Sequence, residues 1–409
     1  MVPAVHPTAS FPDLQESLPR SYIRGADVGS GCVEFSSAMM RLTLSLAGNL
    51  EQTSVERAIA EFRAGRPVLI ARDDGVVLAI GAEDLTADDC ERLDAVAQGS
   101  ARLVLPAARL RRLGLDRKVA GSVSLPTLDR ARIEMLALKV DARIDAPVAC
   151  MTPLHEDALE LARLGLVLPA VIAIPVCQSV ETAPCILSVQ GEAVQAYRQA
   201  VAKALTVVGR APVPLEGAGD SEFVVFRGGE GLRDQVAILV GKPDLTRPVV
   251  VRLHSACLTG DLFGSLKCDC GDQLRETVKF MAGHDGGILL YLDQEGRGNG
   301  IANKMRAYKL QSQGYDTYDA DEILGFELDQ RRFDFAAEML RQLGVRQVRL
   351  MTNNPEKIAA LRKSGLDVVG DQRVMGRATA ENVRYLASKR DRAGHLIDVE
   401  TIARAPAQD

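Results

Sequence analysis

Three cysteines stand close together in a segment whose other residues are mostly polar or glycine. Cys257, Cys268 and Cys270 follow the spacing C-x10-C-x-C. Three soft thiolate ligands suit zinc in tetrahedral geometry, and three ligands with an open fourth position are typical of a catalytic zinc that activates water. Two cysteines separated by one residue in extended chain point the same way. Gly260 and Gly264 then allow the loop to return the first cysteine to the other two.

The cysteine spacing is also compatible with sites that do no catalysis. A structural zinc site would need a fourth ligand, and His254, on the strand that leads into the cluster, is the local candidate. An iron–sulfur cluster and reduced thiols in a core fit the spacing as well, although the polar surroundings weaken the second. The five remaining cysteines are scattered, and we expect them to be small core residues: Cys32, Cys90, Cys150, Cys177 and Cys185.

Two turns that follow predicted strands could bind anions. The strand 288–292 leads into Asp293-Gln-Glu-Gly-Arg-Gly-Asn-Gly300, where backbone N–H groups and a guanidinium can reach phosphate oxygens. Thr352-Asn-Asn-Pro-Glu-Lys357 opens a helix and adds a lysine. Alone, each turn is more typical of an ordinary glycine turn or a plain helix cap than of an anion site. Asp329 and Arg331, at the start of a predicted long helix, would ordinarily be a solvated charge pair.

The hydrophobic patterning predicts two regions of alternating helices and strands. The first contains helices near 54–65, 87–97, 157–164 and 193–203, and strands at 67–71, 76–80, 101–105 and 171–175. Closely spaced glycines and prolines at 207–222 suggest a linker or the entry to a second domain. The second contains strands at 223–226, 235–240, 249–253, 288–292 and 348–351, a helix from Gln330 to Leu343, and a helix that begins at Asn354-Pro355.

These elements predict an α/β fold with mixed sheets and two domains. We expect a partly ordered tail over 1–50, one domain over 51–208 and a catalytic domain over 209–402. The net charge of the 409 residues is 49 − 54 = −5, which argues against binding a nucleic acid polymer by bulk charge. Neither an apolar run of membrane-spanning length nor a secretory signal is evident, so a cytoplasmic protein without a membrane partner is expected.

The motifs of the second region, taken together and in this order, resemble the GTP cyclohydrolase II family. The resemblance covers roughly residues 210–400, about half the chain, and its parts are the run Arg252–Leu274 with the three cysteines, Tyr291-Leu-Asp-Gln-Glu-Gly-Arg-Gly298, the segment Asn303–Thr317, Leu324-Gly-Phe326 and Thr352-Asn-Asn-Pro355.

The resemblance implies a reaction, a set of residues and two metals. A zinc-activated water attacks C8 of guanine with loss of formate, and pyrophosphate is released, which gives 2,5-diamino-6-ribosylamino-4(3H)-pyrimidinone 5′-phosphate, the first committed intermediate of riboflavin synthesis. One zinc per catalytic domain, magnesium on the triphosphate and a homodimer are expected. The metal ligands are Cys257, Cys268 and Cys270, and the residues expected around GTP are Arg252, His254, Ser255, Gln273, Glu295, Gly296, Arg297, Tyr308, Thr317, Thr352 and Lys357.

The catalytic set implied by the resemblance is Tyr308, Asp329 and Arg331. Arg331 occupies the place of the arginine assigned as nucleophile toward the α-phosphorus, and Asp329 that of its base or orienting carboxylate. Because the pKa of a guanidinium exceeds 12, we expect Arg331 to matter whether or not it forms a covalent bond.

Three positions depart from the family pattern. Ala256 stands where glutamate is frequent, Asp293 where arginine is frequent, and Asn299 in place of an aliphatic residue. These changes bear on substrate choice and rate. They leave open a paralogue that acts on another nucleotide, and beside it a non-catalytic zinc- and nucleotide-binding regulator.

The first region faintly resembles dihydroxybutanone-phosphate synthase. The segments 59–70 and 161–170 carry the likeness, but the acidic run that should bind magnesium after the first strand reads Arg72-Asp-Asp-Gly75, and His155-Glu-Asp157 is only a loose echo of the second motif. The sequence therefore predicts a degenerate domain with a structural or assembly role. A bifunctional riboflavin enzyme is the remaining alternative.

Overall fold

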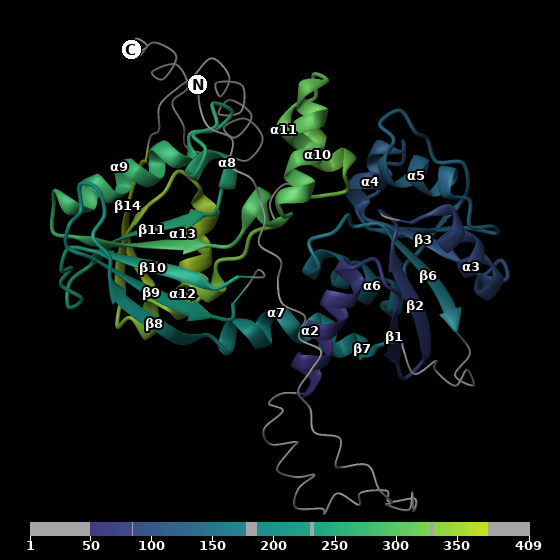
Figure 1. Cartoon of the computed structure of the whole chain (residues 1–409), viewed down its shortest axis with the longest axis horizontal. Coiled ribbons are helices and arrows are strands. Elements are labelled where there is room, and N and C mark those ends of the chain that lie inside the picture. The colour runs from purple at the N-terminus through teal and green to yellow at the C-terminus, as the bar shows by residue number, and fades with distance from the viewer. Residues whose placement is uncertain (1–49, 84, 177–185, 230–232, 328–329, 375–409) are drawn as a thin grey trace, which may run out of the picture. The chain divides into compact units, whose positions relative to one another are not determined.

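The computed structural model describes residues 50–374, except 84, 177–185, 230–232 and 328–329. The tail predicted over 1–50 lies outside the described residues apart from Leu50, as do Cys32, Cys177, Cys185 and Asp329. Two seven-stranded mixed sheets with helices on their faces confirm the predicted α/β class (Figure 1). No helix in the described part of the chain is long and apolar enough to cross a membrane.

The first sheet is buried on both faces. Its strand order is β5-β4-β3-β6-β2-β1-β7, and only β1 and β7 pair in parallel. Along β1 the side chains alternate, with Val68 and Ile70 in one core and Leu69 in the other. The strands are β1 (Val68–Arg72), β2 (Gly75–Gly81), β3 (Arg102–Leu105), β4 (Gly121–Ser124), β5 (Val148–Ala149), β6 (Val171–Val176) and β7 (Ser188–Gln190).

The helices of the first region divide between these two cores. One core takes side chains from α2 (Leu50–Arg63), α6 (Pro153–Leu164) and α7 (Gly191–Lys203), and the other from α3 (Ala87–Ala97), α4 (Ala107–Arg112) and α5 (Arg130–Leu138). The predicted helix 87–97 is confirmed, with Thr86 as its N-cap. Cys90 is a buried core residue as predicted, but the prediction for Cys150 is wrong because its side chain is exposed.

The second sheet has the order β14-β13-β11-β12-β10-β9-β8, with parallel pairing from β12 through β11 and β13 to β14. Its strands are β8 (Thr206–Pro212), β9 (Ser221–Arg227), β10 (Gln235–Val240), β11 (Val249–Ser255), β12 (Gly287–Leu292), β13 (Gln347–Met351) and β14 (Asp367–Gln372). Of the two interpretations of 207–222, the linker is wrong, since β8 fills the first part of that segment and pairs with β9. The domain boundary at 208/209 stays a prediction, and it falls inside β8.

The helices of the second region are α8 (Leu258–Asp261), α9 (Cys270–Ala282), the 3-10 helix η1 (Glu295–Gly298), α10 (Ile301–Ser312), α11 (Thr317–Ile323), α12 (Asp334–Gln342) and α13 (Pro355–Lys363). The helix predicted to begin at Gln330 begins at Asp334 instead. The carbonyl of Arg332 accepts a hydrogen bond from the Gln294 side chain, which holds the preceding segment out of the helix. Asn354 caps α13 as predicted, accepting from the N–H of Glu356.

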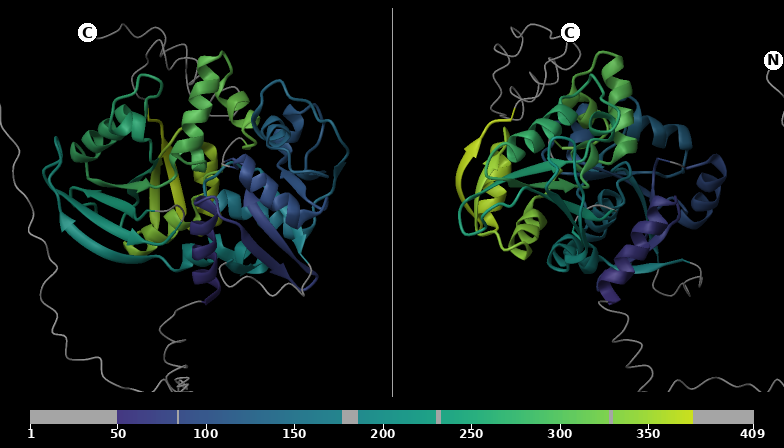
Figure 2. Two further views of the ribbon diagram at one scale, coloured as in Figure 1. Left: turned by 45° about the vertical axis from the view of Figure 1, so that its right-hand side comes forward. Right: turned by 60° about the vertical axis from the view of Figure 1, so that its left-hand side comes forward.

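The helices α10 and α11 pack against the first region of the chain. Ala307 and Leu310 of α10, together with Ile323 of α11, belong to the apolar core that also takes side chains from α3, α4 and α5. The views in Figure 2 keep this pair beside α4. Arg111 and Arg112 of α4 form ion pairs with carboxylates of α11 and the residues after it, so the first region holds two helices of the second.

Candidate functional site

The three cysteine thiols converge on one point at the carboxyl end of β11. Cys257 follows that strand, Cys268 lies in a turn, and Cys270 is the first residue of α9. Their sulfur atoms lie within 4.8 Å of one another, and the Sγ atoms of Cys257 and Cys268 are 3.6 Å apart. Zinc bound to sulfur at about 2.3 Å in tetrahedral geometry separates its ligands by about 3.8 Å. The donor set therefore fits a tetrahedral metal ion.

Glycines permit this convergence. A Cβ atom on Gly260 would lie 2.7 Å from the sulfur of Cys268, and one on Gly271 would lie 2.3 Å from the carbonyl of Gly260. Gly264 has φ +61°, so the loop does turn as predicted. The expectation of an extended Cys-x-Cys pair is wrong, because Cys270 already belongs to α9 and its direction is set by the helix start.

His254 stabilises the segment that carries Cys257 through a contact with Asp261. Its Nε2 lies 3.0 Å from both carboxylate oxygens of Asp261, which also accept from the Cys257 N–H and from the Tyr291 hydroxyl. Burial lowers the pKa of His254, despite the opposing effect of Asp261. Among the described residues, the cluster that could hold a metal contains the three cysteines alone. The arrangement gives no support to a structural site closed by His254.

Lys304 lies against the thiols. Its Nζ is 3.2 Å from the Cys257 sulfur, 3.1 Å from the Thr259 hydroxyl and 2.8 Å from a carboxylate oxygen of Glu295. Burial lowers the pKa of Lys304, but the neighbouring thiolate, Tyr308 and Glu295 outweigh burial, and the net shift is upward. Sequence reasoning missed this lysine. Its spacing of four residues before Tyr308, on one helix face, could have indicated it.

A cavity of about 100 Å³ lies directly beside the thiols. Elements of the second region line it, from the end of β11 through η1, α10 and α11 to the segment before α12. It brings together seven further residues that the sequence predicts for the site: Ser255, Glu295, Gly296, Arg297, Tyr308, Thr317 and Arg331. Sequence reasoning missed several more of its lining residues: Lys267, Gln294, Lys304, Gln311 and Asp321.

The charged side chains of this cavity are held in place by neighbours. Arg297 forms an ion pair with Asp321 and lies 4.9 Å from the ring centre of Tyr318. Its backbone has φ +61°, an uncommon conformation for a residue with a side chain. Burial raises the pKa of Tyr308, so its hydroxyl remains protonated, and Lys267 lies 4.8 Å from its ring centre.

The remaining predicted residues that the structure describes do not line the cavity. Arg252 donates to the Gln273 side chain over 2.5 Å and to the carbonyl of Met351 over 3.0 Å, and burial lowers its pKa to about 10. Lys357 donates to the carbonyl of Leu253 over 2.6 Å. The structure does not bring Arg252, His254, Gln273, Thr352 or Lys357 to the cavity lining, so their contacts with a substrate stay predictions.

Comparisons with known proteins match this region to one family. The family model described as GTP cyclohydrolase II matches residues 206–373. A GTP cyclohydrolase-2 from Xylella fastidiosa (strain Temecula1) is 43% identical over 87% of this chain and 90% of its own length, and one from Azospirillum brasilense is 40% identical over 84% and 94%. A riboflavin biosynthesis protein RibBA from Salinispora tropica is 32% identical over 84% and 98%.

A solved two-domain 3,4-dihydroxy-2-butanone 4-phosphate synthase from A. baumannii matches 79% of this chain and 99% of its own length, at 18% identity and a TM-score of 0.31. The Xylella and Azospirillum relatives span both regions of the chain, not the second alone. The resemblance carried by the cysteine, Gln-Glu-Gly-Arg and Thr-Asn-Asn-Pro motifs is thereby confirmed. The chain is an enzyme of the hydrolase class, and it belongs to the GTP cyclohydrolase II family.

Proposed function

We propose that this protein is a zinc-dependent GTP cyclohydrolase II. It hydrolyses GTP to 2,5-diamino-6-ribosylamino-4(3H)-pyrimidinone 5′-phosphate and releases formate and pyrophosphate, the first step of riboflavin biosynthesis. One observation carries the proposal: three thiols within 4.8 Å of one another beside a cavity lined by Tyr308, Arg297 and Arg331. The family relationship adds a second, independent support. A cytoplasmic homodimer is part of the proposal, and it rests on the family resemblance alone.

Zinc fits the three cysteines, and when bound it supplies a Lewis acid that activates water at neutral pH. Lys304 keeps a positive charge next to the ligand Cys257 and positions Glu295 through a 2.8 Å contact. Tyr308 holds its proton at the edge of the cavity and can donate it to a leaving nitrogen or oxygen. Arg297 and Arg331 provide guanidinium groups for the triphosphate, on which Mg²⁺ is expected.

Zinc affinity should rise steeply with pH. Hydrogen bonds from the other two thiols lower the pKa of Cys257, whereas donation to that thiolate raises the pKa of Cys268 to about 11 and that of Cys270 above its ordinary value. Two protons must then leave on binding, so affinity should increase about 100-fold per pH unit near neutrality. A zinc titration at pH 6.5, 7 and 7.5 measures this, and an affinity independent of pH would contradict it.

Arg331→Ala should reduce pyrophosphate release by about 100-fold or more, because it removes one of the positive charges that line the cavity. Arg332→Ala is a matched control, since that neighbour pairs with Asp334 and does not line the cavity. Release rates are followed with a coupled pyrophosphatase assay. If the Arg331 variant released pyrophosphate as fast as the control, the proposed role of Arg331 would be wrong.

The second candidate is a paralogue that acts on a different purine nucleotide, and the departures at Ala256, Asp293 and Asn299 motivate it. Turnover of GTP, ITP, XTP and ATP by the same zinc-loaded preparation separates the two. We expect GTP to have the highest kcat/KM. A clear preference for another nucleotide would replace the proposed substrate while leaving the ring-opening chemistry in place.

We propose that the first region is a scaffold and not a second active site. The place of the missing acidic run is occupied by Arg72, which forms hydrogen bonds to both carboxylate oxygens of the buried Asp157 and one to Glu192. Gln195 also donates to Asp157 over 2.9 Å. The two carboxylates that contact Arg72, Asp157 and Glu192, are therefore already paired with a guanidinium and are poorly placed to bind a magnesium ion.

The purified chain should form no dihydroxybutanone phosphate from ribulose 5-phosphate and magnesium, because of this arginine pairing. A coupled assay for that product, with an authentic synthase as positive control, measures it. Product formation above the background of a heat-treated sample would overturn the scaffold proposal and favour a bifunctional enzyme.

A further inference from the structure

A second and larger cavity lies next to the cavity beside the thiols and shares part of its lining. Its volume is about 410 Å³, within the range of small-molecule sites in proteins. Helices α2, α6 and α7 of the first region supply one side, and η1 with the segments before β10 and after β12 supply the other. Neither the proposed reaction nor the scaffold role of the first region uses this cavity.

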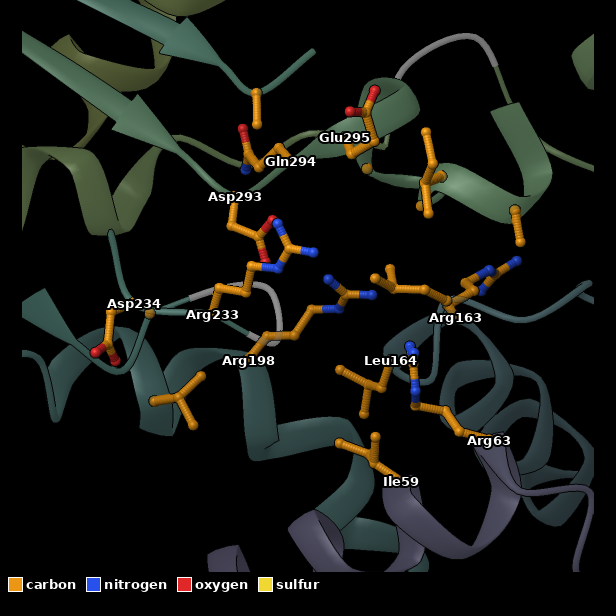
Figure 3. A pocket seen from close by; sticks show the side chains of 18 of the residues that line it. Ile59, Arg63, Arg163, Leu164, Arg198, Arg233, Asp234, Asp293, Gln294 and Glu295 are labelled. Atoms are coloured by element: carbon orange, nitrogen blue, oxygen red, sulfur yellow. The ribbon is translucent and has the colours of Figure 1, made fainter. Parts of the chain in front are cut away.

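Arginines from four separate segments line this cavity: Arg63 of α2, Arg163 of α6, Arg198 of α7 and Arg233 before β10. Figure 3 shows Arg63, Arg198 and Arg233 reaching toward the same space. Within the described residues, neither Arg63 nor Arg233 has a carboxylate within ion-pair distance. Arg63 donates only to the carbonyl of Gly165 over 2.8 Å. These two guanidiniums keep donors available for an anion.

The other two arginines are positioned by one shared carboxylate. Glu160 accepts from Nε of Arg198 over 2.7 Å, and its second oxygen lies 3.6 Å from Nη1 of Arg163. The side chains of all three are partly buried. A guanidinium presents its N–H donors in a rigid fork, so the carboxylate shared by Arg163 and Arg198 fixes the direction of both side chains.

The remaining lining indicates more than an inorganic ion. Ile59, Leu164 and Leu166 provide apolar surface, and the Asp293 carboxylate, which can accept from hydroxyl groups, projects into the cavity (Figure 3). A lining that holds both arginines and a carboxylate suits a molecule that carries a phosphate together with hydroxyl groups.

We propose that this cavity binds a small phosphorylated polyol, such as a sugar phosphate, as an effector of the enzyme. The proposal goes beyond the proposed function, because the site lies outside the catalytic cavity. The two cavities share Ala256, Gln294 and Glu295, and Ala256 immediately precedes the metal ligand Cys257. Glu295 also accepts hydrogen bonds from the Leu258 N–H and from Lys304. An occupant of the larger cavity would therefore contact a residue that binds the segment next to the metal ligand Cys257.

The experiment measures binding of ribose 5-phosphate to the full-length protein by isothermal titration calorimetry, without GTP. Arg63→Gln combined with Arg233→Gln should weaken binding by about tenfold or more, since two charge-assisted contacts are lost. Both residues are exposed, so folding should be retained. Arg57→Gln, an exposed arginine on α2 that does not line the cavity, is the matched control and should bind as the parent does.

A second variant separates this site from the catalytic cavity. Arg331→Ala should bind ribose 5-phosphate as tightly as the parent. Ribose alone should not bind, and inorganic phosphate should bind more weakly than the ester. The proposal is overturned if ribose 5-phosphate does not bind, if the Arg63/Arg233 double variant binds it normally, or if Arg331→Ala abolishes binding. None of these outcomes depends on whether GTP is the substrate.

Discussion

Cys268→Ser should lose its zinc and form no detectable formate from GTP. The serine hydroxyl is a poor ligand for zinc, and the remaining thiols cannot complete the site. Substitution of a residue that hydrogen-bonds to a metal ligand typically lowers metal affinity by about 10- to 100-fold. We therefore expect loss of a ligand itself to lower zinc affinity by more than about 100-fold. Zinc content after dialysis is measured by atomic absorption, and formate by a dehydrogenase-coupled assay.

Cys150→Ser is the control for this substitution, because Cys150 is exposed and lies outside the cluster. It should retain one zinc per chain and parental turnover. The metal assignment would be wrong if Cys268→Ser kept stoichiometric zinc. If it lost zinc but still formed formate, the metal would be structural and the proposed role of zinc in activating water would fail.

Arg109→Met should destabilise the protein by about 3 kcal/mol or more, because a buried acceptor that loses its donor costs about 1–3 kcal/mol and Arg109 serves several such acceptors. Arg109 is 1% exposed, and burial lowers its pKa to about 10, so it remains charged. It donates to the carbonyls of Met135, Leu136 and Lys139 at the end of α5, and to the carbonyl of Ile323 at the end of α11. Methionine would leave these buried carbonyls without that donor.

Urea unfolding measures this change, and Arg92→Met is its matched control. Arg92 is 76% exposed and pairs with Asp88 only across the surface of α3, so its loss should cost less than about 0.5 kcal/mol. The Arg109 variant should also have a raised KM for GTP, because α11 begins at the cavity residue Thr317. Equal unfolding midpoints for the two variants would rule out Arg109 as the link between the regions.

The thiol cluster could be predicted from the sequence because its residues are close along the chain. Spacing alone restricts where Cys257, Cys268 and Cys270 can lie, and the glycines between them indicate a loop. The prediction that Cys268 and Cys270 form an extended pair is wrong for a local reason. α9 begins at Cys270, and the helix sets the direction of that side chain. Lys304 was missed because its 3.2 Å contact with Cys257 joins residues 47 positions apart.

The two main errors in the elements also have physical causes. β8 is an edge strand with mostly exposed side chains, so it lacks the buried alternation by which strands are recognised, and its glycine and proline resemble a linker. The helix predicted from Gln330 has good periodicity, but tertiary contacts override it. The carbonyl of Arg332 accepts a hydrogen bond from the Gln294 side chain. Gln330 packs closely on Gly298, because a Cβ atom added to that glycine would lie 3.2 Å from the carbonyl carbon of Gln330.

Contacts between the two regions could not be predicted by pattern. Arg109 reaches a carbonyl 214 residues away, and Arg306 of α10 donates to Glu83 in the first region over 2.8 Å. Nothing in the local sequence of α4 distinguishes the buried Arg109 from the half-buried arginines on the same helix. These contacts give the first region a physical role, because they place α10 and α11, which carry Lys304, Tyr308 and Thr317.

The most direct test is incubation of the zinc-loaded protein with GTP and magnesium, with formate and pyrophosphate measured in the same sample. We predict equal amounts of both products, in proportion to the enzyme's zinc content. Pyrophosphate without formate would indicate a pyrophosphohydrolase that leaves the guanine ring intact. Neither product, with zinc bound at one per chain, would contradict the proposed cyclohydrolase function.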